Sequence, residues 1–173
     1  MKKTFAILLA VMLLASMATI ASAANTTTLT TTVPAAKYTL NIPADRNISF
    51  GATKTSIGEL TVTGTSGFAE GKDLKVSITY EPFTCEDVNT SIPISLSAWY
   101  SADNGSNLGE TVSIASGSAL TFKGKSNGSV ENCVYKSYYL DYLNLEVNSA
   151  DWGKALAGEY TATITFTAEV VAG

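Results

Sequence analysis

Apolar and polar residues alternate along several stretches of this chain, which is the pattern of β-strands with one face toward water. The alternation is clearest in residues 73–80, 92–100 and 160–170, where every second position is apolar. Weaker versions of it occupy residues 26–33, 37–42, 57–64, 111–114, 119–123 and 139–148. Strands therefore predominate in the predicted structure, with the apolar side of each strand turned toward a common core.

The strand expected in residues 160–170 carries the most regular pattern. Tyr160, Ile164 and Phe166 fall on one face, and threonines fill most of the other. Because the side chains of a strand point alternately to opposite faces, these three residues share a side. We expect them to lie in the centre of the core.

Turn residues between the apolar runs predict the fold class. Gly, Asn and Asp separate most of the runs, as in antiparallel sheets, and strands do not alternate with long helices as in parallel ones. So many half-apolar strands need two packed sheets. We predict an all-β fold, an antiparallel two-sheet β-sandwich that is immunoglobulin-like or jelly-roll-like; a small barrel is the alternative arrangement. One short helical turn is expected in residues 149–156, with Ser149 as its N-cap.

The first 23 residues have the three parts of a secretory signal peptide, and they resemble bacterial ones. Two lysines form the positive end, residues 5–20 are apolar, and Ala21-Ser22-Ala23 is a small-residue cleavage site. This pattern predicts a signal peptide in residues 1–23 and a single domain in residues 24–173. We expect the mature protein to be secreted or extracellular and to have no membrane span. Any association with the cell surface would then be non-covalent or through a partner.

Removal of the signal peptide would leave 9 Lys and Arg residues against 15 Asp and Glu residues, a net charge of −6. Binding to a phosphate backbone needs clustered basic residues that displace counterions, so this charge argues against nucleic acid. It argues equally against an anionic membrane surface. We expect a protein or a glycan at the cell surface as the partner, with self-assembly as a further option.

The chain has two cysteines, Cys85 and Cys133. An even number of cysteines in an exported protein favours a disulfide, because extracellular compartments are oxidising. A bond between residues this far apart would restrict the unfolded chain and stabilise the fold by about 4 kcal/mol. We therefore predict that Cys85 and Cys133 are bonded.

The residue inventory argues against an enzyme. The chain has no histidine, which excludes Ser-His-Asp and Cys-His nucleophile systems and histidine-based zinc sites. Residues 103–107 (Asp-Asn-Gly-Ser-Asn) offer oxygen ligands for calcium, but they lack the pattern of a calcium-binding loop and are expected to form a hairpin turn. No catalytic residue, metal site or cofactor is predicted.

Aromatic residues form the candidate binding site. Alternation sends Tyr100 inward, so its neighbour Trp99 is expected to point toward solvent. Tyr138 and Tyr142 are expected to share the face opposite Leu143. Exposed rings stack on sugars or anchor a protein partner, so Trp99, Tyr138 and Tyr142 are the predicted contact residues. The alternative is that a second sheet or a loop covers these rings.

Residues 157–166, Ala-Gly-Glu-Tyr-Thr-Ala-Thr-Ile-Thr-Phe, resemble the closing strand of secreted bacterial β-sandwich surface proteins: pilin-like and spore-coat-like subunits, and WxL-type surface domains. In those families an Ala-Gly-x-Tyr sequence enters the last strand from a turn, which matches Gly158 and Tyr160 here. The Trp-x-Leu signature tied to cell-wall binding is absent from this position, and the chain has its own closing strand, unlike chaperone-assembled pilins. The resemblance implies secretion and a β-sandwich, with adhesion or assembly as the function.

Together these features predict a secreted, non-enzymatic bacterial β-sandwich that acts in surface adhesion or as a structural, pilus-like subunit. The alternative is a stand-alone carbohydrate-binding module. An exposed aromatic surface would favour glycan binding, whereas an unpaired edge strand would favour assembly.

Overall fold

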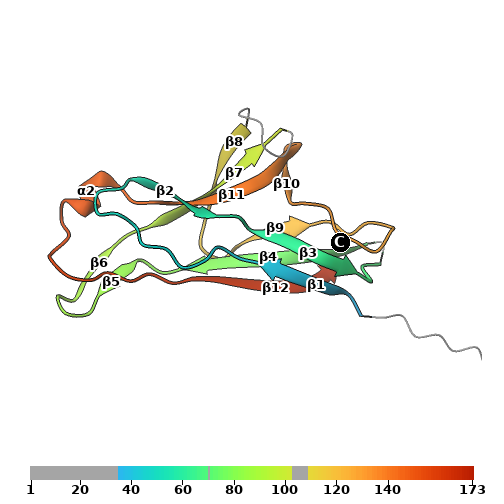
Figure 1. The fold of residues 1–173 in the computed structure, drawn as a ribbon, viewed down its shortest axis with the longest axis horizontal. Helices are drawn as coiled ribbons and strands as arrows, with labels where there is room; N and C mark the ends of the chain where they lie inside the picture. Colours follow the sequence, from blue (N-terminus) through green and yellow to red (C-terminus); the bar gives the residue numbers. More distant parts are fainter. Residues whose placement is uncertain (1–34, 70, 103–108) are drawn as a thin grey trace, which may run out of the picture. The chain divides into compact units, whose positions relative to one another are not determined.

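A computed structural model describes residues 35–69, 71–102 and 109–173 (Figure 1). The expected signal peptide, the expected strand 26–33 and the expected turn 103–107 lie outside these residues. The described residues fold into antiparallel strands and one short helix, which confirms the all-β class.

The strands pair only in the antiparallel sense within this part of the chain. In chain order the elements are β1 (Lys37–Asn41), β2 (Lys54–Gly58), β3 (Thr61–Ser66), β4 (Lys72–Tyr80), β5 (Phe83–Cys85), β6 (Thr90–Ile92), β7 (Ser95–Ser101), β8 (Gly109–Ile114), β9 (Ser118–Phe122), β10 (Val134–Tyr135), β11 (Tyr138–Glu146), α2 (Ser149–Trp152) and β12 (Ile164–Ala172). No helix among the described residues is long and apolar enough to cross a membrane.

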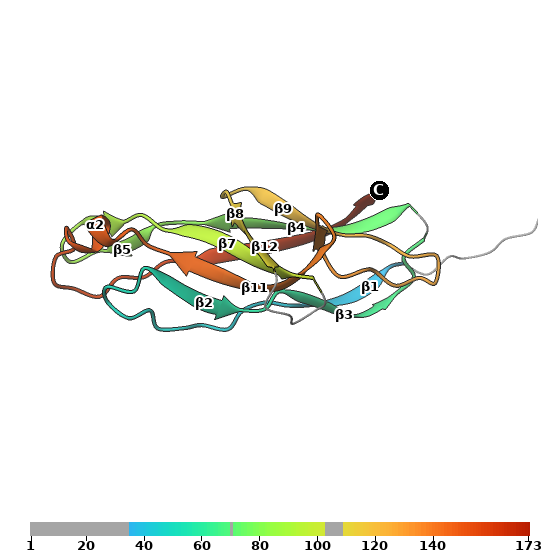
Figure 2. The same ribbon diagram turned by 90° about the horizontal axis from the view of Figure 1, so that it is seen from above.

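Two sheets contain most of the strands. The five-stranded sheet has the order β10-β11-β7-β8, and β2 pairs with the second half of β11, beside which it lies in Figure 2. The three-stranded sheet has the order β12-β4-β9, while β1-β3 and β5-β6 form two-stranded sheets. We call the side of the five-stranded sheet that carries Leu96, Ala98 and Leu143 its core face, and the opposite side its outer face.

The core is built from the apolar faces of these sheets. Every second residue of β4 from Leu74 to Ile78 is fully buried, and Leu96 and Ala98 of β7 are buried as well. Residues of both strands belong to one hydrophobic cluster. The alternation expected along β4 is therefore confirmed. In β7 the apolar residues face the core as expected, but Ser97 and Ser101 on the opposite face are buried as well.

The closing strand lies at the margin of this core. Tyr160, Ile164 and Phe166 contact the hydrophobic cluster, but they are only partly buried. The reason is that β12 is the outer strand of its sheet and pairs only with β4 among the described strands. Val170 faces Leu74 across that pair and is still 41% exposed. The expected central position of these residues is therefore wrong.

The limits of several predicted elements also change: the strand expected in 92–100 is divided between β6 and β7, and that expected in 160–170 begins at Ile164. The expected strand 57–64 divides, because β2 pairs with β11 whereas β3 pairs with β1. Gly58, at the end of β2, has a φ of 127°, which a residue with a side chain rarely adopts. Helix α2 is capped by Asn148 instead of Ser149, since the Asn148 side chain accepts a hydrogen bond from the backbone N–H of Ala150. None of these differences follows from alternation along the sequence.

Both cysteines are free thiols, so the predicted disulfide is wrong. Cys85 ends β5 and Cys133 precedes β10; in Figure 1 β5 lies toward the left end and β10 in the upper right half, well apart from it. Cys85 is so closely packed that a Cβ atom on Gly158 would lie 2.5 Å from its Sγ atom. Cys133 instead lies beside Tyr100, with 3.8 Å between its Sγ atom and the tyrosine hydroxyl. Each thiol fills a separate buried site.

Free thiols can be counted directly. Denatured, unreduced protein is expected to react with two equivalents of a thiol reagent, since neither cysteine is bonded. Native protein should react much more slowly, because the side chains of Cys85 and Cys133 are only 2% and 4% exposed. With an aromatic disulfide as the reagent, each cysteine that reacts releases one aromatic thiol, and the absorbance of this product measures both reactions. If the denatured, unreduced protein showed no reactive thiol, the prediction of a bond between Cys85 and Cys133 would be correct after all.

Candidate functional site

Two aromatic residues form a stacked pair on the outer face of the five-stranded sheet. Trp99 of β7 and Tyr142 of β11 are opposite each other in the strand register. Their ring centroids are 6.2 Å apart, and their planes differ by 14°. The indole also lies over Gly109 of β8, where a Cβ atom would come within 3.0 Å of the ring atom Cζ2. Both side chains are partly exposed on the face that the alternation indicated.

An irregularity in β11 places Tyr138 on the other face. Leu140 and Tyr142 pair with consecutive residues of β7, so Asp141 is an extra residue without a partner on that strand. Because of this extra residue, the side chains on one side of the bulge along the strand point to the opposite faces from those that strict alternation predicts. Tyr138 therefore lies on the core face and packs, partly buried, against the hydrophobic cluster. The expectation that Tyr138 and Tyr142 share a face is wrong.

Tyr139 occupies the outer-face position that was expected for Tyr138. Its register with β7 places it on the side of Trp99, and its side chain is 40% exposed. We call Trp99, Tyr139 and Tyr142 the aromatic surface. The signal in the sequence is the spacing of three, instead of two, between the first two leucines of β11. That spacing indicates an extra residue in the strand.

A row of polar side chains continues from the aromatic surface along β11. Asn144 and Glu146 follow Tyr142 on the outer face, and they pair with Ser97 of β7 and Lys54 of β2 respectively. The hydroxyl of Ser97 donates to the carboxylate of Glu146 at 2.7 Å, and the Lys54 ammonium lies 3.2 Å from the same oxygen. These contacts, that of Ser97 first, lower the pKa of Glu146. The carboxylate is therefore ionised and already paired.

Asn144 differs from its neighbours in this row. It lies on the outer face, yet its side chain is only 3% exposed, and its Nδ2 atom has no hydrogen-bond partner among the described residues. Buried polar groups are nearly always paired, and an unpaired donor costs about 1–3 kcal/mol. Sequence analysis missed Asn144 because an asparagine on the polar side of a strand is normally exposed. Its amide is a donor held next to the aromatic surface.

A second feature is a hollow of about 260 Å³ lined by residues of β7, β9 and the segment that leads into β10. Tyr100, Leu120, Cys133 and Tyr135 form part of its lining. Burial raises the pKa of Cys133 and that of Tyr100. Both groups are therefore neutral near pH 7, and Cys133 is not an activated nucleophile.

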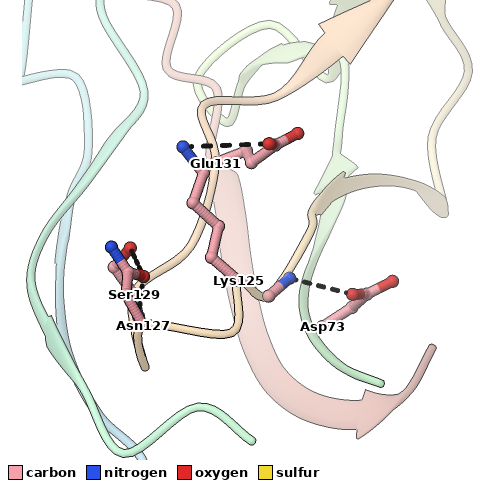
Figure 3. Close-up of polar contacts among 6 residues, drawn as sticks. Asp73, Lys125, Asn127, Ser129 and Glu131 are labelled. Atoms are coloured by element: carbon pink, nitrogen blue, oxygen red, sulfur yellow. Dashed lines mark hydrogen bonds and ion pairs between the residues drawn. The ribbon is translucent and has the colours of Figure 1, made fainter. Parts of the chain in front are cut away.

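Lys123 and Glu131 also line this hollow, and the segment between them is held by its own polar contacts (Figure 3). The backbone N–H of Gly124 donates to the Asp73 carboxylate at 3.0 Å. Lys125 and Glu131 form an ion pair at 3.7 Å. These contacts hold the segment in place and pair Glu131, one of the charged side chains that line the hollow. We therefore place the candidate site at the aromatic surface and its polar row.

No protein-family model, curated protein or solved structure matches this chain. The resemblance of residues 157–166 to secreted surface proteins stays a prediction. Across the described ranges, no three His, Cys, Asp or Glu side chains gather where they could hold a metal ion. The aromatic surface is therefore interpreted from the chemistry of its own side chains.

The bulge in β11 predicts different roles for two adjacent tyrosines. Tyr138→Ala is expected to lower the free energy of unfolding by about 1–2 kcal/mol, because Tyr138 packs against the core. Tyr139→Ala should change it by less than about 0.5 kcal/mol, because that side chain is 40% exposed. Urea denaturation followed by fluorescence measures both. Equal losses of unfolding free energy in the two variants would contradict the bulge that places the two tyrosines on opposite faces.

The hydrogen bond from Ser97 is expected to control the titration of Glu146. Ser97→Ala should raise the pKa of Glu146, because this bond favours the ionised carboxylate, and Lys54→Ala should also raise it. A lowered pKa stabilises the fold above the unfolded-state pKa and loses that effect as the pH falls through the folded pKa. The Ser97 variant should therefore lose less stability on acidification. Carboxyl carbon NMR gives the pKa, and an unchanged value would contradict the assigned bond.

Proposed function

We propose that this protein is a secreted, non-enzymatic bacterial adhesion protein whose aromatic surface contacts a partner at the cell surface. The observation that carries this proposal is the stacked pair of Trp99 and Tyr142 on the outer face of the five-stranded sheet. A pair that served only stability would gain more from the core face, where burial is complete. On the outer face the rings are partly exposed beside polar groups, which is the composition of a recognition site.

A β-sandwich, of immunoglobulin-like or jelly-roll-like type, is the architecture that we propose for the protein. The five-stranded and three-stranded sheets contribute to the same hydrophobic cluster, for example with Leu143 from β11 and Val76 from β4. Two sheets that share one apolar core are the basis of a sandwich. In such an arrangement the outer face of the five-stranded sheet is turned away from the core, as a contact surface requires.

Export and charge support a role at the cell surface. Residues 1–23 have the pattern of a signal peptide, and the remaining chain carries a net charge of −6 without a basic cluster in its sequence. A partner that is recognised through aromatic rings and neutral polar groups fits this charge better than a polyanion does. Proteins and glycans of a cell surface are partners of this kind.

A structural, pilus-like subunit is the second candidate. It is favoured by β12, a nine-residue strand that pairs only with β4 among the described strands. The backbone of an edge strand can pair with a strand of another chain. The hydroxyl of Tyr38 donates to the Ala168 carbonyl of β12 at 3.4 Å, which occupies one group of this edge. We rank adhesion first because the aromatic surface offers side-chain recognition as well.

The proposal predicts that Trp99 and Tyr142 carry the binding energy. Trp99→Ala and Tyr142→Ala should each weaken binding to immobilised surface glycans or purified surface proteins by at least about tenfold, as for aromatic hot spots. The matched control is Thr165→Ala, an exposed position on the other large sheet. Surface plasmon resonance measures the affinities of all variants.

Two results would contradict the proposed function. Binding that survives both aromatic substitutions would remove the aromatic surface as the contact site. Hydrolysis of the offered glycan or protein by the purified chain would show that the protein is an enzyme. Concentration-dependent oligomers in light scattering, without binding to either class of partner, would favour the pilus-like candidate instead.

A further inference from the structure

Among the described residues, Nδ2 of Asn144 is the one buried side-chain polar atom without a hydrogen-bond partner. Its side chain is 3% exposed, and Nδ2 has no partner among the described residues. By contrast, the neighbouring hydroxyl of Ser97, equally buried, donates to Glu146 at 2.7 Å. A leucine at position 144 would avoid the unpaired donor. An unpaired buried donor that a leucine would avoid needs an explanation, and binding of a ligand that accepts the hydrogen bond supplies one.

The position of Asn144 connects the donor with the aromatic surface. Along β11 its outer-face neighbours are Tyr142 on one side and Glu146 on the other. Across the strands it faces Ser97 on β7 and Ser56 on β2. The amide is thus flanked by an aromatic ring on one side and by hydroxyl and carboxylate groups on the others. A ligand that reached it would meet an apolar wall and a polar wall together.

The charges around Asn144 indicate a neutral ligand. The Glu146 carboxylate is paired with Lys54 at 3.2 Å and with Ser97, so no unpaired charge of either sign remains within this row. An Nδ2 donor needs an oxygen acceptor, which an uncharged hydroxyl or ring oxygen supplies. The face of a pyranose ring that carries only C–H groups packs against aromatic rings, while its hydroxyls bind polar side chains. A sugar therefore matches both walls.

We propose that the outer face binds a neutral pyranose of a glycan, with the sugar packed against Trp99 and Tyr142 and one of its oxygens accepting a hydrogen bond from Asn144. This inference rests on the proposed function, because it specifies the partner of the same surface. Binding requires a neighbour of Asn144 to turn aside.

The experiment compares neutral oligosaccharides with a charged one by isothermal titration calorimetry on the purified protein. The neutral probes are cellohexaose, maltohexaose, mannohexaose and N-acetylchitohexaose, and the anionic probe is sialyllactose. At least one neutral probe should bind, with an affinity that changes less than about twofold between low and high salt, since no charge is involved. Sialyllactose should bind at least about tenfold more weakly, because no unpaired cation awaits its carboxylate.

The variant Asn144→Leu separates a binding role from a structural one. It removes the donor at similar volume, so the affinity for the neutral probe should fall at least about tenfold while the midpoint of thermal unfolding stays or rises. Thr165→Ala, outside the surface, should change neither. In wild-type protein the side-chain amide signal of Asn144 in a nitrogen-15 NMR spectrum should shift on addition of the same probe.

Three outcomes would overturn the inference, and they are distinct from failure of the proposed function. Absence of binding by all neutral probes, unchanged affinity in Asn144→Leu, or an unshifted amide signal would each remove the sugar site. If a surface protein still bound and lost its affinity in Trp99→Ala, the adhesion function would stand without a sugar. If neither sugars nor surface proteins bound, both would fail.

Discussion

The antiparallel pairing of β7 with β11 is the constraint on which the rest of the described structure depends. It places Ala98 opposite Leu143, so that both strands turn apolar side chains to one core face. The same register places Tyr142 opposite Trp99 on the outer face. The other strands of this sheet add to the two edges of the pair. One ladder of hydrogen bonds thus positions both the core and the aromatic surface.

The outer face has the mixed character of a recognition site. Its aromatic rings are partly exposed, whereas Ser97 and Asn144 beside them are almost completely buried. A sheet face that only meets water usually shows the reverse, with polar groups exposed and apolar groups turned inward. The stability lost with the unpaired amide of Asn144 is compensated by the apolar core. The sugar that we propose as ligand would give that amide a partner.

The free cysteines show that this fold is held by packing. Residues 33–173 form one compact unit, which is long enough to bury a substantial core without a covalent crosslink. Cys85 fits against the backbone of Gly158, where a side chain on the glycine would collide with its sulfur. Cys133 lies beside Tyr100 in a different part of the core. Each acts as a small apolar group at its own site.

The sequence by itself determined the strands of β4 and β7 and the side to which Trp99 points, because alternation follows from the local geometry of an extended backbone. It carries one signal of the bulge at Asp141, the spacing of three between Leu140 and Leu143, but it could not show the pairing register, the separation of the two cysteines or the burial of Asn144. These features depend on which strands pair and in what register, and that choice is made by residues far apart in the chain. The tertiary structure therefore decided which tyrosines join Trp99, and which polar group lies unpaired beside it.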